Sequence, residues 1–242
     1  MDRSPWCRST PVRRPVGGLW ESLSEPWRVC LEEAWGAYCA GSLPIGAAVA
    51  GAGGRVLARG RNRIFESEPS GRTLFGRRLA HAEVNALVQL DHAAVDPRTC
   101  TLYTTTEPCP LCVGAVQMCL VGEVRYAARD PAAGSAALLE ASPFMRRGGV
   151  RVVGPERADL ETVAAALLFA WALREGHTTW VATHLEATLP DAAALGRVLH
   201  AEGRLADLAR TARPAADVVD AVARRGAGAD GRADPAPSAP GA

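Results

Sequence analysis

The sequence predicts an α/β protein of three layers, α/β/α, followed by a helical C-terminal extension. Several segments repeat apolar residues every three or four positions, which is typical of helices, and short apolar runs between them are typical of strands. The predicted order is α-β-β-α-β-α-β. After this series, about 18 residues separate Pro131 from a fifth apolar strand at 150–154, which is enough for a crossover to a parallel neighbour. We therefore expect a mixed sheet of five strands.

The first predicted helix covers residues 20–40, where Leu23, Trp27, Leu31 and Trp35 share one face. The next two apolar runs, 45–50 and 55–59, are joined by a Gly-rich turn and predict a hairpin. The stretch from 61 to 80 is irregular and polar. The elements expected after it are a helix at 81–90, strands at 100–105, 123–128 and 150–154, and a helix at 109–120.

The later part of the chain is predicted to be helical. Asp159 is placed to cap a helix that ends near Gly176. Segment 178–188 is ambiguous, and 191–211 and 215–225 predict two amphipathic helices. We expect a domain at 19–176 and an extension at 177–225. Residues 1–18 predict a flexible arm, and residues 226–242 are rich in Gly, Ala and Pro and predict a disordered tail.

Composition excludes several classes of protein. All 27 basic side chains are arginines, so chemistry that requires a lysine amine, including Schiff bases and Walker-type phosphate loops, is excluded. The net charge of +1 provides no overall field for nucleic acid or an acidic membrane. Seven cysteines, an odd number, argue against a secreted disulfide framework. With no signal peptide or apolar span of about 20 residues, we expect a cytoplasmic protein without membrane contact.

The most informative pattern is His81-Ala82-Glu83, followed after 24 residues by Pro108-Cys109-Pro110-Leu111-Cys112. Two cysteines three residues apart in the first turn of a helix can face one point. A histidine at the start of another helix can supply a third ligand, and this set suits tetrahedral zinc. Three protein ligands leave one position open, which is typical of catalytic zinc rather than structural zinc.

The other cysteines do not close this site. Cys119 lies seven residues beyond Cys112, about 10 Å along the helix axis, and should not reach the same ion. Cys30, Cys39 and Cys100 belong to other elements and are expected to pack as small apolar side chains. Glu83 is about 200° from His81 around a regular helix. It is therefore expected to carry protons beside the metal rather than to bind it.

This pattern resembles the signature of the zinc-dependent cytidine deaminase-like superfamily. Segments LPIGAAVA (43–50), GRNR (60–63), HAEVNAL (81–87), TLYTTTEPCPLCVGAVQMC (101–119) and VRYAARDPAAGS (124–135) extend it. They are similar to successive motifs of the branch that contains guanine deaminases, tRNA adenosine deaminases and fungal-type cytosine deaminases. The resemblance covers roughly residues 20–155, and the chain after them lies outside the family pattern.

The resemblance implies a cytidine deaminase-like fold and one zinc ion per chain, bound by His81, Cys109 and Cys112 with water or hydroxide as the fourth ligand. It implies Glu83 as the general acid/base and Asn62 as a substrate-binding residue. The implied reaction replaces the amine at carbon 6 of a purine or carbon 4 of cytosine by a carbonyl group and releases ammonia. It also implies a homodimer.

The substrate is expected to be a small nucleobase or nucleoside. The sequence of the segment TEPCPLC and the crossover before 150–154 favour a purine. Residues 201–242 contain six arginines and six acidic residues, which weakens a tRNA substrate. A tRNA adenosine (A-to-I) deaminase stays an alternative because the loop between Asn62 and His81 contains Arg63, Arg72, Arg77 and Arg78. A zinc-binding inactive partner subunit is an alternative from a different class.

Overall fold

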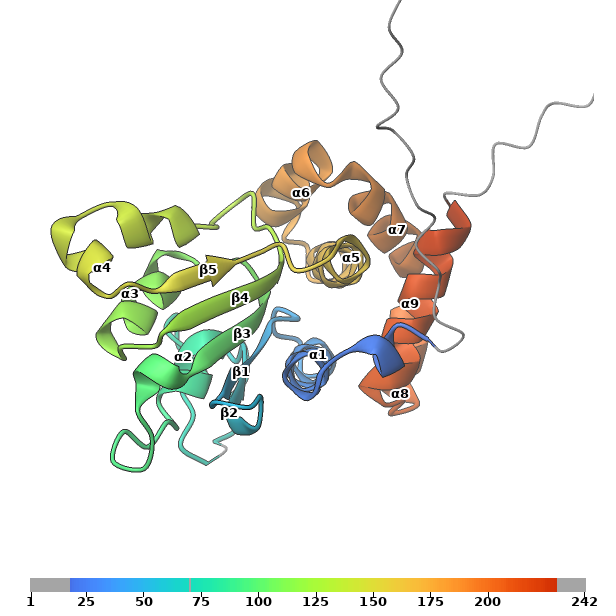
Figure 1. Ribbon diagram of the computed structural model, residues 1–242. Coiled ribbons are helices and arrows are strands. Elements are labelled where there is room, and N and C mark those ends of the chain that lie inside the picture. The colour runs from blue at the N-terminus through green and yellow to red at the C-terminus, as the bar shows by residue number, and fades with distance from the viewer. Residues whose placement is uncertain (1–17, 70, 230–242) are drawn as a thin grey trace, which may run out of the picture.

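The computed structural model describes residues 18–69 and 71–229 and contains a mixed sheet in the order β2-β1-β3-β4-β5 (Figure 1). The strands are β1 (Gly46–Ala50), β2 (Val56–Arg61), β3 (Thr101–Thr106), β4 (Glu123–Ala128) and β5 (Arg151–Val153). β1 pairs antiparallel with β2 and β3, whereas β3, β4 and β5 are parallel. The predicted hairpin, the crossover and the mixed five-stranded sheet are thus confirmed.

Helices cover both faces of this sheet (Figure 1). One face packs against α1 (Glu25–Cys39) and α5 (Ala158–Arg174), and the other against α2 (Ala82–Leu87) and α3 (Pro110–Met118). Successive residues of β1 point to opposite faces of the sheet. Ala48 packs in the core formed with α1 and α5, and Ala47 packs in the core formed with α2 and α3. This arrangement confirms the three-layer prediction. The short helices of this part are η1 (Trp20–Ser22), η2 (Pro97–Thr99), η3 (Ala136–Glu140) and α4 (Pro143–Arg147).

Close packing of α2 on the edge strand β2 depends on Gly60. A Cβ atom at Gly60 would lie 2.4 Å from the Ala86 nitrogen and 2.5 Å from the Ala82 oxygen, both in α2. Any larger residue would force this helix away from the sheet. Because α2 begins directly after His81, this contact sets the position of that histidine relative to the sheet.

The C-terminal extension forms an outer layer on α1 and α5 (Figure 1). It consists of a π-helical turn η4 (Thr178–Ala182), α6 (Thr183–Thr188), α7 (Pro190–Ala201), α8 (Arg204–Arg210) and α9 (Ala215–Ala229). Leu195, Leu199 and Val218 are buried in the same core cluster as Trp35 of α1 and Phe169 of α5. Among the helices of the described ranges, none has the length and apolar character needed to cross a membrane.

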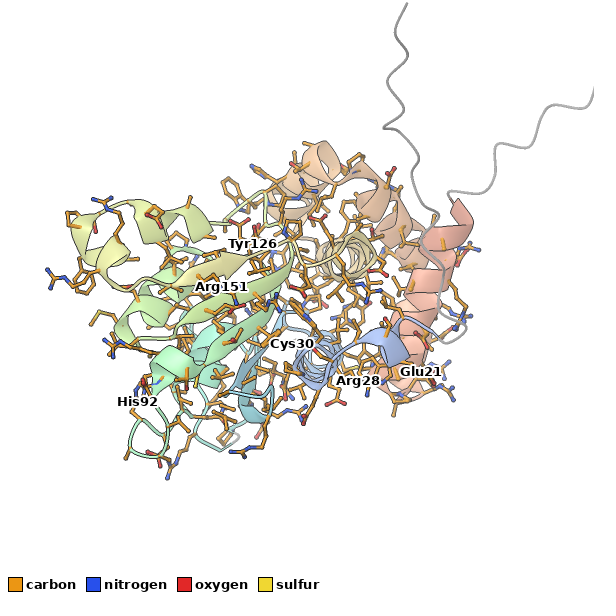
Figure 2. All side chains as sticks on the ribbon, in the orientation of Figure 1. Glu21, Arg28, Cys30, His92, Tyr126 and Arg151 are labelled. Atoms are coloured by element: carbon orange, nitrogen blue, oxygen red, sulfur yellow. The ribbon has the colours of Figure 1, made fainter. Side chains whose placement is uncertain are left out.

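Cysteine packing agrees with the expectation at two positions and differs at a third. Cys30 and Cys100 are buried, and Cys30 lies between α1 and the sheet (Figure 2). Cys39 is exposed near the end of α1. The expectation of packing for Cys39 is therefore wrong, because the helix ends at this residue and its side chain meets solvent.

Two helix starts differ from the prediction. The segment 20–40 begins as the single turn η1 and becomes α1 only at Glu25, because Pro26 lacks the N–H needed inside a helix and suits only a first turn. The cap of α5 is Arg157 rather than Asp159. Asp159 lies inside the first turn, where its carboxylate accepts a hydrogen bond from the Leu160 N–H at 2.8 Å.

The end of the chain also departs from the predicted boundaries. The helix predicted over 191–211 is two helices, because Gly203 adopts a left-handed φ of 64° between α7 and α8. α9 continues to Ala229, so the predicted start of the tail at residue 226 falls within a helix. The rest of that predicted tail, and residues 1–17 of the predicted arm, lie outside the described residues.

Candidate active site

His81, Cys109 and Cys112 lie together where two helices begin. His81 precedes α2 and Cys109 precedes α3, both with extended backbone, and Cys112 lies in the first turn of α3. His81 Nδ1 is 3.5 Å from the Cys109 sulfur and 3.5 Å from the Cys112 sulfur, and the two sulfurs are 3.7 Å apart. The structure thus brings together the three residues that the sequence predicts as metal ligands.

These separations can be compared with those of a zinc tetrahedron. With Zn–S of about 2.3 Å and Zn–N of about 2.0 Å, tetrahedral angles place two sulfurs about 3.8 Å apart and a nitrogen about 3.5 Å from each sulfur. The three side chains match those edges, so they fit a tetrahedral zinc ion with one open corner. Cys119 lies at the C-terminal end of α3 and outside the group, as expected.

The surroundings favour thiolate at this point. The hydrogen bond with Cys112, assisted by one with His81, lowers the pKa of Cys109 to about 4. The same hydrogen bond and burial raise the pKa of Cys112, so the two sulfurs share one proton. The hydrogen bond with Cys109 raises the pKa of His81. Positive ends of two helices add to the stabilisation of negative charge on sulfur.

Glu83 lies beside this group in the first turn of α2 and is 4% exposed. Its Oε2 is 3.3 Å from the Cys112 sulfur, and its Oε1 accepts a hydrogen bond from the Thr104 hydroxyl at 3.0 Å. Burial raises the pKa of this carboxyl group. Because His81 precedes the helix, the angular argument from a regular helix does not apply to this pair. The carboxylate is nevertheless adjacent to the ligand group and outside it.

Asn62 follows β2 and is 1% exposed. Its N–H donates to the Ile45 oxygen at 2.9 Å, and its Oδ1 accepts from the Ile64 N–H at 3.2 Å. The next N–H, of Arg63, donates to the Ala80 oxygen at 2.9 Å. Asn62 is thereby held beside the segment that leads into His81, at the same end of the sheet as the ligand group.

The structure adds residues that the sequence did not identify. Thr104 could have been found, because alternation along 101–106 places it on the face of the buried Leu102. Glu66 could not, because it lies in an irregular loop. There it pairs with Arg61 and Arg63, so Arg63, counted above as a candidate phosphate contact, is buried in an ion pair instead. Arg72, Arg77 and Arg78 of the same loop are exposed.

An aromatic stack joins this loop to the start of the C-terminal extension. The Phe65 ring centroid lies 6.2 Å from that of Trp171 and 5.6 Å from that of His177, and Trp171 and His177 are 4.9 Å apart. The interplanar angles are between 16° and 23°, which describes stacked rings. The extension therefore contacts the turn that carries Asn62.

Comparison with known proteins shows similarity over part of the chain. Residues 21–128 match the family model for the cytidine and deoxycytidylate deaminase zinc-binding region. The chain is 37% identical over 95 residues to the tRNA(Ile)-lysidine synthase of Deinococcus radiodurans, a match to 38% of this chain and 15% of that protein. It is 36% identical over 111 residues to the tRNA-specific adenosine deaminase of Bacillus subtilis, covering 45% of this chain and 63% of that protein.

A solved structure of guanine deaminase from Nitrosomonas europaea is 26% identical, with a TM-score of 0.47, and the match covers 62% of this chain and 86% of that one. The chain spans less than two thirds of the length of the curated relatives described above. Residues 21–128 are therefore similar to the zinc-binding region of cytidine and deoxycytidylate deaminases, and over 111 residues the chain is similar to a tRNA-specific adenosine deaminase.

Proposed function

We propose that this chain is a zinc-dependent hydrolase that deaminates a small nucleobase or nucleoside, preferably a purine, and releases ammonia. The observation that carries this proposal is the set of tetrahedral separations among His81, Cys109 and Cys112, with a buried carboxylate 3.3 Å from one sulfur. Three soft or borderline ligands leave one position open for water, and a proton carrier lies beside it. This arrangement suits hydrolysis, whereas a structural site is closed by a fourth side chain.

His81, Cys109 and Cys112 would hold one zinc ion per chain, which supplies a Lewis acid that lowers the pKa of a water molecule in the open position. The water oxygen bonds to the amine-bearing carbon as the ring C=N double bond opens, and the Glu83 carboxylate carries one proton of that water to the ring nitrogen. Glu83 then carries the second proton, from the new hydroxyl group, to the amine. The C–N bond breaks, and a carbonyl and ammonia are left. Thr104 orients Glu83, and Asn62 hydrogen-bonds the substrate.

One feature supports a small substrate, and two support a purine base. The net charge of +1 provides no overall attraction for a polyanion. The relative from Bacillus subtilis bears the name of a tRNA-specific adenosine deaminase, which supports a purine base but not a small substrate. β5 pairs parallel with β4, so the chain crosses over before β5, and this crossover favours the branch of deaminases that act on purines.

A tRNA adenosine deaminase is the second candidate, and one observation favours it. Arg72, Arg77 and Arg78 are exposed in the loop that ends at His81, where a polynucleotide backbone would pass if its base entered the site. A loss of activity of tenfold or more between 50 and 200 mM salt on tRNA, and no turnover of nucleosides, would favour this candidate.

We also propose a homodimer. Large apolar side chains are exposed on and beside α2 and α3, and they are Leu79, Val88, Leu111, Met118 and Leu120. Exposed apolar patches of this kind are typical of protein interfaces. Sedimentation of the full chain should give twice the mass of one chain, and a Met118→Glu variant should shift it toward the monomer.

Ammonia release from zinc-loaded protein tests the activity, with adenine, guanine, cytosine, their nucleosides and tRNA as substrates. Glu83→Gln should retain zinc and lose about 10³-fold in kcat, because it removes the proton carrier. Glu140→Gln changes an exposed carboxylate on η3 and is the matched control. Equal turnover by wild type and Glu83→Gln would overturn the mechanism. Stoichiometric zinc without turnover of any substrate would indicate the inactive partner subunit.

A further inference from the structure

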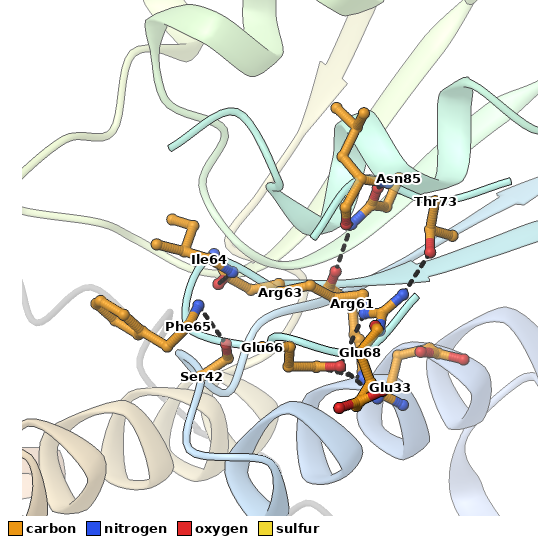
Figure 3. Close-up of polar contacts among 12 residues, drawn as sticks. Glu33, Ser42, Arg61, Arg63, Ile64, Phe65, Glu66, Glu68, Thr73 and Asn85 are labelled. Atoms are coloured by element: carbon orange, nitrogen blue, oxygen red, sulfur yellow. Dashed lines mark hydrogen bonds and ion pairs between the residues drawn. The ribbon is translucent and has the colours of Figure 1, made fainter. Parts of the chain in front are cut away.

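A buried carboxylate joins the two arginines that flank Asn62 (Figure 3). Glu66 is 8% exposed. Its Oε1 lies 2.8 Å from Arg61 Nε, and its Oε2 lies 2.8 Å from Arg61 Nη2 and 2.8 Å from Arg63 Nε. The contact with Arg61 is bidentate, the geometry in which guanidinium and carboxylate bind with most directional specificity. One carboxylate therefore fixes the side chains on both sides of Asn62.

Arg63 extends this ion-pair cluster to the rest of the loop. Its Nη1 donates to the Thr73 hydroxyl at 2.6 Å, and its Nη2 donates to the Glu68 carbonyl at 2.5 Å. The Glu66 N–H donates to the Arg63 carbonyl at 3.2 Å. The three nitrogens of the Arg63 guanidinium group thus contact three different residues of the loop. Its described residues, 62–69 and 71–80, contain no helix or strand that could hold its shape.

The backbone at Asn62 connects this cluster with the candidate active site. The Asn62 N–H bonds to Ile45, ahead of β1, and the Arg63 N–H bonds to Ala80, next to His81. These two backbone hydrogen bonds hold Asn62 between the start of β1 and the segment that leads into His81. A shift of Arg61 or Arg63 would therefore move Asn62 relative to the histidine.

Electrostatics make the carboxylate hard to replace. Burial alone would raise the pKa of Glu66, but its hydrogen bonds with Arg61 and Arg63 outweigh burial and lower it. Loss of the carboxylate would leave two guanidinium groups side by side, one of them with a side chain only 4% exposed. Both arginines line a cavity of about 200 Å³, so the released side chains have space to move into.

We propose that Glu66 is a positioning residue, which fixes Asn62 for substrate binding by pairing with Arg61 and Arg63. This rests on the proposed function, in which Asn62 contacts the substrate. Glu66 itself touches neither substrate nor metal ligands. Its effect on the reaction should pass through Asn62 and should appear in KM rather than in kcat or zinc content.

A double-mutant cycle tests this route with the substrate found in the ammonia screen. Glu66→Gln should raise KM about tenfold, with kcat within threefold of wild type and zinc content unchanged. In an Asn62→Ala background, the same change should raise KM less than twofold, because the residue it positions is gone. Glu68→Gln, an exposed carboxylate two residues along the same loop, is the matched control and should leave KM unchanged.

Equal KM effects in both backgrounds, or a parallel loss of zinc and kcat, would overturn the proposal and indicate a merely structural role. Arg61→Lys keeps the charge but loses the bidentate contact, and it should reproduce the KM effect more weakly even if Glu66→Gln does not fold.

Hydrogen exchange separates the positioning role of Glu66 from the proposed function. If wild type releases no ammonia, the proposed function fails. Faster exchange of the Ile64 amide in Glu66→Gln but not in Glu68→Gln would still support positioning, and unchanged exchange would overturn it.

Discussion

The ligand group and the Asn62 turn lie at the same end of the sheet, but different forces position them. His81, Cys109 and Cys112 belong to two helix starts, and each helix is held by burial of its apolar face. Asn62 belongs to a loop, where ion pairs between side chains take the place of regular hydrogen bonding. Zinc binding should therefore tolerate changes in the loop, whereas substrate binding should not.

The largest expected effect is on the ligand group. Cys112→Ser should lower zinc content from one ion per chain to below about 0.1 and abolish deamination, because a serine hydroxyl is a far weaker zinc ligand than a thiolate. Metal analysis and ammonia release measure both. Cys119→Ser, on the same helix but outside the group, is the control and should retain zinc and activity. Full zinc content in the Cys112 variant would contradict the assignment of Cys112 as a ligand.

The second effect is on stability and depends on pH. At pH 7, Glu66→Gln should lower the free energy of unfolding by about 2 kcal/mol, because it removes a buried, charge-assisted pair. Denaturant titrations of wild type and variant measure this difference. The charged groups that face Glu66 are Arg61 and Arg63, with Glu33 of α1 beyond Arg61.

The sign of the pH dependence follows from the lowered pKa of Glu66. A carboxyl group with a folded pKa below its ordinary value of 4.5 stabilises the fold above that value. The contribution is lost as the pH falls through the lowered pKa. The difference between wild type and Glu66→Gln should therefore be constant from pH 7 to about 5 and shrink below pH 4.5. A difference that grows in acid would contradict the pairing.

The smallest effect concerns the aromatic stack. His177→Ala removes a ring that stacks on both Phe65 and Trp171, and it should lower stability by about 1 kcal/mol. KM should rise less than threefold, because the ion-pair cluster still holds the turn. His200→Ala on the exposed side of α7 should change neither quantity. A larger KM effect from His177→Ala than from Glu66→Gln would mean that the extension, and not the ion pairs, positions Asn62.

The difference between regular elements and the irregular loop also explains which parts of the structure could be predicted from the sequence. Periodicity found the five strands, and the His-x-Glu and Cys-x-x-Cys spacings found side chains that meet in the structure, because these patterns follow local backbone geometry. Helix ends were less accurate: Gly203 divides a segment whose apolar spacing continues without interruption. The positive φ at that glycine carries no signal in the hydrophobic pattern.

Contacts between residues without regular spacing could not be predicted from the sequence. Glu66 is a buried acid in a polar stretch, and its burial depends on two arginines that an inspection of charge alone counts as solvent-exposed. Similarly, the stack of Phe65 on His177 joins residues far apart in the chain. The sequence predicts neither pairing, because both arise from how the loop and the extension pack on the finished domain.

X-ray absorption at the zinc edge of the purified full chain tests most directly whether His81, Cys109 and Cys112 bind zinc. We expect one zinc ion per chain, with two sulfur ligands at about 2.3 Å, one histidine nitrogen at about 2.0 Å and one further light atom, in four-coordinate geometry. Cys119→Ser should leave that spectrum unchanged. A closed four-sulfur shell, or a site of oxygen ligands only, would contradict a catalytic zinc held by His81, Cys109 and Cys112.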